Sequence, residues 1–345
     1  MKLLIYFTKI SHVMKILFIG NFTIDYCTEV HHKKTLEKLG HEVITVQENT
    51  ATKEEILEKL DGISLLMHTH THSWHIQGIE EVYQACKEAR IPTVGYHLDL
   101  WFGIERERDL ETDPYWRIQY FFSVDKKMVD YLNSHENMPK AFFLPAGVFE
   151  DECHLGTPRE EYKHDIIFVG SKGYHPEWQY RPQLIEWLQK TYGKRFAHYG
   201  GDGRGVVRGE RLNDLYASAK VVIGDTLCKN FDYPYYLSDR VFETTGRGGF
   251  IIHPYIKGLE DLFELHESFD SRNHPQNIGS VELITYNFGD FNQLNDLINT
   301  FVENDELRNE IRMNGFERTK KDHTYTNRLS EMLRIVTIEK DLKNR

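Results

Sequence analysis

Four histidines lie within eight positions of one short stretch, and their spacing raises the question of metal binding. They are His68, His70, His72 and His75, in the run LLMHTHTHSWH. In an extended strand, alternate side chains share a face, so the first three would stand together, as metal ligands can. Parallel side chains on one strand, however, rarely converge on one ion. We therefore expect no metal ligand here. We expect the first three rings and Trp74 to line a ligand-binding cleft, with an ordinary polar loop as the alternative.

The elements that must position these side chains alternate between strand and helix in both halves of the chain. This pattern is typical of parallel sheets that helices cover on both faces. In the first half, strands are predicted at 15–20, 41–46, 63–68, 91–97, 120–125 and 141–145. In the second half, strands are predicted at 165–171, 195–201, 220–226 and 249–254, with a short helix at 259–265 and only long helices over 291–340. The predicted fold class is α/β, with two facing Rossmann-like domains, an interdomain cleft and C-terminal helices.

A chain of 345 residues is too long for one ordinary core, so two domains are expected. The polar stretch 149–164 lacks apolar periodicity and is the best candidate for a linker. It separates an N-terminal, acceptor-side domain (1–148) from a C-terminal, nucleotide-binding domain (165–320). A last helix within 321–345 is expected to pack back toward the N-terminal domain. The first thirteen residues precede a strand that starts at a second methionine, and they read as an extension.

Composition narrows the class of protein. The chain has 42 Lys and Arg against 53 Asp and Glu, a net charge of −11. This charge disfavours a broad electrostatic contact with nucleic acid, although the stretch 194–211 offers a local basic patch. No apolar run approaches the ~20 residues needed to cross a bilayer. The four cysteines are far apart and form no C-x-x-C pair, which is typical of reduced thiols, so we expect a cytoplasmic protein.

Ligands of parallel α/β sheets bind beyond the carboxyl ends of the strands, so the residues that follow each strand are the site candidates. On the first domain these are Gly20, Asn21, His97, Asp99 and Trp101, and on the second they are Gly170, Ser171 and Asp225. A histidine can hydrogen-bond a sugar hydroxyl or take up a proton near neutral pH. His97, with Asp99 second, is therefore the candidate catalytic residue. A histidine bonded only to backbone at a strand end is the alternative.

The helix predicted over 238–248 carries the residues best suited to a phosphate. Ser238 is a favourable N-cap residue, and the N–H groups of a first helical turn attract anions. Arg240 can add charge-assisted hydrogen bonds to the same group. Glu243, about one turn further on, can accept both hydroxyls of a ribose. The alternative is that Arg240 and Glu243 form a surface ion pair at i, i+3.

The segment that contains this helix, YPYYLSDRVFETTGRGGFIIHPYIKGLEDLFE (233–264), is the most distinctive of the chain. It resembles the C-terminal signature of the CgeB-type (spore-maturation-protein-like) glycosyltransferases, within the broad group-1 glycosyltransferases. That signature has a helix with S-x-R-x-F-E, a glycine turn, an apolar strand and G-L-E-x-L-F. The matching residues are Ser238, Arg240, Phe242, Glu243, Gly248, Gly249, Gly258, Leu259, Glu260, Leu262 and Phe263. Similar segments occur at 120–125, 142–148, 164–171, 180–188, 212–224 and 322–329, so the resemblance covers most of the chain from residue 120 onward.

The resemblance implies a GT-B fold and a nucleoside diphosphate sugar, UDP- or GDP-linked, as donor. It implies that the nucleotide lies on the second domain, with Arg240 near the pyrophosphate, Glu243 near the ribose, and Val241 and Phe242 in the same segment. It also implies metal-independent transfer without a prosthetic group, with retention of anomeric configuration. The chain departs from the pattern at Tyr235, where many group-1 enzymes have a glutamate eight positions before the ribose glutamate.

Three functions are compatible with these residues. The first is transfer of a hexose or pentose from the donor to an acceptor, which could be a glycan, a protein, a small molecule or a modified base in DNA. The second is sugar-nucleotide epimerisation or hydrolysis on the same scaffold, since acid-base candidates are present. The third is a non-catalytic nucleotide- or carbohydrate-binding module, against which an intact pair of Arg240 and Glu243 argues.

Overall fold

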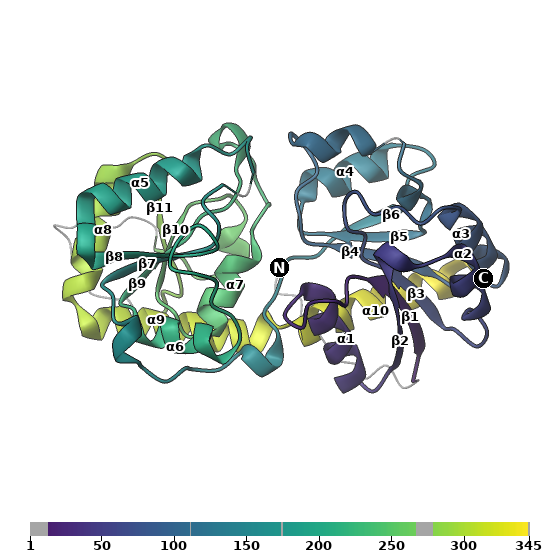
Figure 1. The fold of residues 1–345 in the computed structure, drawn as a ribbon, viewed down its shortest axis with the longest axis horizontal. Helices are drawn as coiled ribbons and strands as arrows, with labels where there is room; N and C mark the ends of the chain where they lie inside the picture. Colours follow the sequence, from purple (N-terminus) through teal and green to yellow (C-terminus); the bar gives the residue numbers. More distant parts are fainter. Residues whose placement is uncertain (1–12, 111, 174, 267–278, 344–345) are drawn as a thin grey trace.

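The computed structural model describes residues 13–110, 112–173, 175–266 and 279–343, and it contains two α/β domains side by side (Figure 1). The expected extension before the second methionine lies almost wholly outside the described residues. Each domain has a single sheet in which all paired strands are parallel. The predicted fold class is therefore confirmed at the level of two parallel α/β sheets.

The first sheet has six strands in the order β2-β1-β3-β4-β5-β6. They are β1 (Lys15–Gly20), β2 (Glu42–Gln47), β3 (Leu65–His68), β4 (Thr93–His97), β5 (Tyr120–Ser123) and β6 (Lys140–Phe143). Helices α1 (Thr28–Lys38), α2 (Lys53–Glu58), α3 (Ile79–Glu88) and α4 (Lys126–Ser134) connect them, with 3₁₀ helices η2 (Glu105–Asp109) and η3 (Pro114–Arg117) between β4 and β5. Each predicted strand of this half is present.

The second sheet has five strands in the order β11-β10-β9-β7-β8. They are β7 (Ile166–Val169), β8 (Phe196–Tyr199), β9 (Val221–Ile223), β10 (Ile251–Pro254) and β11 (Ile284–Tyr286), connected by helices α5 (Tyr180–Tyr192), α6 (Glu210–Ser218) and α7 (Asp239–Gly246). The sequence analysis missed β11, which is only three residues long and therefore gives no periodic signal. The short helix predicted at 259–265 is a 3₁₀ turn over Leu259–Asp261.

The long helices predicted over 291–340 are present as α8 (Phe291–Glu303), α9 (Asp305–Asp322) and α10 (Tyr325–Lys343). Figure 1 shows α9 under the second sheet and α10 crossing to lie beside α1 of the first domain. Apolar side chains of α10, including Leu329 and Met332, join the core that Ile16 and Phe18 of β1 form. The last helix is thus held on the first domain, because its apolar side chains are buried in the core of that domain.

The two domains also meet at the ends of their sheets. Tyr233, in the second domain, donates from its hydroxyl to Oδ2 of Asp125 at 2.8 Å, and a backbone bridge joins Asp125 to Tyr236. Asp125 is fully buried and caps α4 through the N–H groups of Lys127 and Met128. This contact holds segment 233–237, just before α7, against the first domain.

Candidate functional site

Two guanidinium groups meet at the carboxyl end of the second sheet. Arg240, on α7, donates from Nε to the carbonyl oxygen of Val169 at 3.1 Å and from Nη1 to that of Asp225. Arg181, on α5, donates from Nη1 to the carbonyl oxygen of Ser171 at 3.3 Å. Burial, together with the neighbouring Arg181, lowers the pKa of Arg240. The structure therefore brings two cations to the ends of β7 and β9.

Asp225 holds one of these cations in place. Its carboxylate is fully buried and accepts from Nε of Arg181 at 2.7 Å and from the indole N–H of Trp178 at 3.0 Å. Because its carboxylate accepts from both Arg181 and Trp178, Asp225 fixes the position of the Arg181 guanidinium. The sequence analysis named Asp225 but missed Arg181 and Trp178. The only available signal was their place near the start of a helix, which does not reveal which strand end that helix faces.

Helix α7 starts against the same strand ends. Ser238 is its N-cap residue, but its hydroxyl makes no capping bond and instead donates to the carbonyl oxygen of Asp225 at 3.4 Å. The expectation that its side chain caps the helix is therefore wrong, because the end of β9 lies close enough to compete for the hydroxyl. Val241 and Phe242 are fully buried, with Phe242 packed against Phe263. They are core residues that fix the angle of α7, and their side chains do not face solvent.

The carboxylates of α7 remain accessible. Glu243 has a side chain 33% exposed, and its nearest basic group is Nη2 of Arg247 at 4.0 Å. Asp239 is exposed. The surrounding protein and the neighbouring Glu243 raise the pKa of Asp239 to about 6. The alternative interpretation, an ion pair between Arg240 and Glu243, does not appear among the contacts of the described residues, since Arg240 points toward β7.

His97, at the end of β4, has a defined protonation state. Its Nδ1 accepts from the indole N–H of Trp101 at 3.2 Å and from the backbone N–H of Asp99 at 3.3 Å. The ring proton must therefore lie on Nε2. Burial lowers the pKa of His97 to about 4, so the ring is neutral at pH 7. A neutral ring in this tautomer can donate one hydrogen bond from Nε2 but cannot serve as a base through that atom.

Asp99 lies where the first domain approaches the second. Burial raises its pKa, but His97 and Arg106 together lower it more, and Nη1 of Arg106 lies 3.3 Å from Oδ2 of Asp99. Across the junction, desolvation and, to a smaller extent, the charge of Asp99 raise the pKa of Asp239 on α7 and of Tyr236. The ends of the two sheets thus face each other, and the structure brings the His97 and Asp99 pair to the same region as α7.

Trp101 and the loop after β1 have mainly structural contacts. Trp101 is fully buried and packs edge-on against Trp116 at 4.8 Å between ring centroids. Gly20 approaches α1 so closely that an added Cβ would lie 2.9 Å from Cγ of Glu29. The side chain of Asn21 accepts from the backbone and hydroxyl of Thr23, which shapes the local turn. No contact of these residues reaches the Arg240 group among the described hydrogen bonds.

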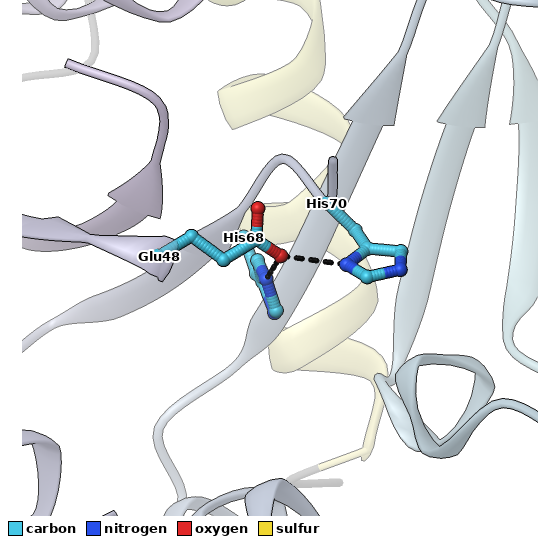
Figure 2. Close-up of side chains that lie close together, drawn as sticks. All are labelled: Glu48, His68 and His70. Carbon is cyan, nitrogen blue, oxygen red and sulfur yellow. Dashed lines mark hydrogen bonds and ion pairs between the residues drawn. The ribbon is translucent and has the colours of Figure 1, made fainter. Parts of the chain in front are cut away.

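The histidine run forms a buried polar cluster rather than an open wall. His68 and His70 are 2% and 4% exposed, and both bond to one oxygen of Glu48, at 2.9 and 2.6 Å (Figure 2). Glu48, just after β2, is itself 2% exposed. Burial alone would raise its pKa, but the two imidazoles lower it to about 2. The expectation that His68 and His70 line a cleft is therefore not met, because an unforeseen carboxylate draws both rings inward.

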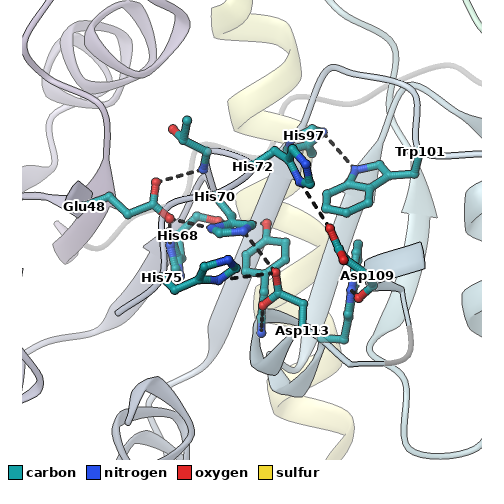
Figure 3. Close-up of polar contacts among 12 residues, drawn as sticks. Glu48, His68, His70, His72, His75, His97, Trp101, Asp109 and Asp113 are labelled. Carbon is teal, nitrogen blue, oxygen red and sulfur yellow. Dashed lines mark hydrogen bonds and ion pairs between the residues drawn. The ribbon is translucent and has the colours of Figure 1, made fainter. Parts of the chain in front are cut away.

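The rest of the run lies closer to solvent. His72 is partly exposed, with Nδ1 3.6 Å from Oδ2 of Asp109, and its ring stands edge-on to Trp101 (Figure 3). Trp74 is half-buried, and the side chain of His75 is 63% exposed. Figure 3 shows His72 beside His97. Of the predicted acceptor-side residues, His72 remains partly exposed and contacts Trp101, which hydrogen-bonds to the candidate catalytic histidine.

Comparison with known proteins places this geometry in context. Residues 179–334 match a family model described as glycosyl transferase-like. No curated protein sequence matches the chain. None of the described helices is long and apolar enough to cross a lipid bilayer.

Several solved structures are similar over nearly the whole chain. An alpha-glucosyltransferase in complex with UDP-glucose and DNA containing an abasic site has 12% identity and a TM-score of 0.65, with 94% of this chain and 100% of that chain covered. HepE of Anabaena, in complex with UDP-glucose, has 13% identity and a TM-score of 0.60, with 93% and 99% covered. A glycosyltransferase from Rickettsia africae has 12% identity and a TM-score of 0.59, with 94% and 97% covered. The predicted GT-B fold is confirmed: this chain has that fold, and its residues 179–334 match the glycosyl transferase-like model.

Proposed function

We propose that this protein is a metal-independent glycosyltransferase that moves a sugar from a nucleoside diphosphate sugar to an acceptor. The observation that carries the proposal is the convergence of Arg240 and Arg181 at the end of β7, beside the first turn of α7. The match of residues 179–334 to the glycosyl transferase-like model supports it. Similar structures that hold UDP or UDP-glucose support a uridine nucleotide as the first donor to test, ahead of GDP.

The diphosphate would bind between the two guanidiniums and the N–H groups of α7. When the bond to the sugar breaks, negative charge grows on the leaving diphosphate, and fixed cations and dipoles stabilise it most when water is excluded. Two arginines and a helix N-terminus can supply the positive charge that a divalent cation supplies in metal-dependent enzymes. The exposed carboxylate of Glu243, on the same helix, would accept the ribose hydroxyls.

The sugar would lie against the first domain. His97 offers a hydrogen-bond donor from Nε2, which suits a sugar hydroxyl, and Asp99 lies beside it with its pKa lowered by His97 and Arg106. Gly20, Asn21, Gly170 and Ser171 would contribute backbone at the strand ends. His72 and Trp74 would face the acceptor, on the N-terminal side of a division near residues 149–164.

The finer assignments are part of the same proposal. The signature in 233–264 favours a CgeB-type enzyme that retains the anomeric configuration in the cytoplasm. A modified base in DNA is one acceptor to test, because a similar glucosyltransferase was solved in complex with DNA. The net charge of −11 favours a glycan, protein or small-molecule acceptor instead.

The experiment is a thermal-shift and calorimetric panel of UDP, GDP, TDP and ADP on the purified chain. We expect UDP to stabilise the wild type, Arg240→Ala to abolish the shift, and Glu243→Ala to reduce it. Arg195→Ala is the matched control, because Arg195 pairs with Asp165 at the opposite end of the second sheet. If Arg240→Ala and Glu243→Ala bind UDP as the wild type does, the site is misassigned.

Catalysis is tested with UDP-glucose and other UDP-sugars, with free UDP as the product measured. Turnover that rises with a glycan or DNA acceptor identifies transfer. Interconversion of the donor sugar without UDP release would indicate epimerisation and contradict the proposal. Binding of UDP without turnover of any donor would leave only a binding module, and would also contradict it.

A further inference from the structure

The histidine run and the loop before η3 contain a second group of ligand-type atoms, separate from the Arg240 group. It comprises Nε2 of His70, Nδ1 of His75 and Oδ2 of Asp113, which lie within 4.8 Å of one another. Oδ2 of Asp113 is 3.2 Å from Nε2 of His70 and 4.0 Å from Nδ1 of His75 (Figure 3). Zinc bonds of about 2.0 Å in a tetrahedral site place donor atoms about 3.3 Å apart. One pair already has this spacing.

Two of these atoms are buried and have only each other as a close polar partner. Nε2 of His70 and Oδ2 of Asp113 make no hydrogen bond of acceptable geometry, although they lie at ion-pair distance. Buried polar atoms are almost always hydrogen-bonded, so a facing pair that lies close but makes no well-aligned hydrogen bond is suited to hold a ligand between its atoms. The third atom belongs to His75, whose side chain is 63% exposed and can rotate toward the pair. The group therefore has two fixed donors and one adjustable donor on the solvent side.

The carboxylate of Glu48 orients His70 so that its Nε2 faces Asp113. An ionised carboxylate only accepts hydrogen bonds, so the ring nitrogens that face Glu48 must both carry protons. His70 thus donates from Nδ1 to Glu48, and its Nε2 is turned toward Asp113. Oε2 of Glu48 accepts from the backbone N–H of Thr71 at 2.8 Å. With a metal ion on Nε2 of His70, this would be the carboxylate–histidine–metal arrangement that orients zinc ligands in proteins.

Asp113 is held in the same way. Its Oδ1 accepts from the backbone N–H of Tyr115 at 2.9 Å, which leaves Oδ2 directed at His70. The two buried carboxylates, Glu48 and Asp113, face one imidazole that can carry a second proton, so the cluster keeps a net negative charge without a cation. A divalent ion in place of that proton would neutralise the cluster.

The alternative set of Glu48, His68 and His70 is less suitable. Its atoms also lie within 4.8 Å of one another, but Glu48 already accepts a hydrogen bond from each ring. The other nitrogen of His68 bonds to the hydroxyl of Tyr83 at 2.7 Å. An ion there would have to break well-formed hydrogen bonds, whereas an ion at His70, His75 and Asp113 would replace one ion pair that lacks hydrogen-bond geometry.

We propose that His70, His75 and Asp113 bind one divalent transition-metal ion, with Zn²⁺ the best match to two imidazoles and a carboxylate. The ion would link the loop after β3 to the loop before η3, with its fourth position open to water. Binding would release the Nε2 proton of His70 to solvent and form three metal–ligand bonds. This metal site is compatible with metal-independent sugar transfer, since the ion would lie apart from the Arg240 group. The metal proposal does not depend on the proposed function.

The test is a zinc and cobalt titration of the full chain after removal of metals with a chelator. We expect one equivalent of Zn²⁺ to bind at micromolar concentration and to raise the melting temperature, and Co²⁺ to give the absorption bands of a low-coordinate site. His75→Ala removes an exposed ligand, so the variant should fold and bind at least about tenfold more weakly. Glu48→Gln, which keeps the shape but not the charge, should weaken binding about 10- to 100-fold.

His72→Ala is the matched control, because His72 lies in the same run and is not one of the three ligands. It should bind zinc as the wild type does. The proposal is overturned if the wild type binds no zinc at micromolar concentration. It is also overturned if His75→Ala retains wild-type affinity, or if His72→Ala weakens binding as much as His75→Ala, because the ion would then lie elsewhere among the histidines. Nucleotide binding is not measured in this experiment, so its outcome is independent of the donor site.

Discussion

The guanidinium of Arg240 lies directly against Gly170, the first residue after β7. A Cβ added to Gly170 would lie 2.6 Å from Nη2 of Arg240, and Gly170 has a φ of +140°, which side chains with a Cβ rarely adopt. The strand end therefore needs glycine both for its backbone conformation and for the approach of the arginine. This contact explains how a residue 70 positions away in the sequence can share one candidate phosphate site.

Gly170→Ala should displace the Arg240 side chain and weaken nucleotide binding. Because the new methyl group occupies the position of the guanidinium, we expect UDP affinity to fall about tenfold, the loss of one charge-assisted hydrogen bond. Calorimetry with UDP measures it. Gly173→Ala is the control, since Gly173 lies in the same loop with nothing within 4 Å of an added Cβ. Equal affinity for the two variants would argue against Arg240 as a phosphate ligand.

Arg181→Ala should strongly destabilise the second domain. The substitution leaves the fully buried carboxylate of Asp225 with only the indole of Trp178, and an uncompensated buried charge costs about 3–5 kcal/mol. Arg195→Ala removes a pair of the same 2.7 Å length, but Arg195 is 47% exposed, so the cost should stay below about 1 kcal/mol. Urea unfolding of both variants measures the difference. If both variants lost a similar free energy of unfolding, the ion pair of Arg181 and Asp225 would not be isolated from water.

Because of Asp125, the free energy of unfolding should depend on pH between about pH 4 and 6. Burial raises the pKa of Asp125 from 3.8 to about 6, although the bond from Tyr233 acts in the opposite direction. Between about pH 4 and 6 the folded protein binds the proton more readily than the unfolded chain does. The free energy of unfolding therefore falls, by up to about 3 kcal/mol for this group, as the pH rises through that window.

Asp125→Asn keeps the cap of α4 but removes this titration. Relative to the wild type, the variant should gain stability as the pH rises from about 4 to 6, and the difference should be constant above that range. Urea unfolding at a series of pH values measures it. The control is Asp290→Asn at the exposed N-cap of α8, whose profile should follow that of the wild type. A constant difference between Asp125→Asn and the wild type from pH 4 to 7 would contradict the prediction.

His97→Ala should slow sugar turnover without changing UDP affinity. Removal of one neutral hydrogen bond to the sugar should lower the rate about three- to tenfold. Because the pKa of His97 is lowered to about 4, the rate should show no loss from this group between pH 5 and 8. UDP release from a UDP-sugar across that range measures both effects, with His135→Ala at the exposed end of α4 as control. A rate limb near pH 6.5 that disappears in His97→Ala would show that the ring acts as a base.

The sequence by itself determined most strands, most helices and the order of the two sheets. Apolar runs and their polar boundaries depend on residues close together in the chain, so β1 and β7 could be located without tertiary information. The same holds for Arg240 and Glu243, which lie on one predicted helix that follows a strand end. The short strand β11 was missed because three residues show no period.

The tertiary structure alone decided which side chains meet. Glu48 and Asp113 draw His70 into a buried cluster, and Arg181 pairs with Asp225, although the partners lie 22 to 44 residues apart or in different loops. Parallel strands bring distant loops to one sheet edge, and the strand order that sets their neighbours is not encoded in local periodicity. Whether a histidine lines a surface or is buried therefore depends on carboxylates that only the fold brings near.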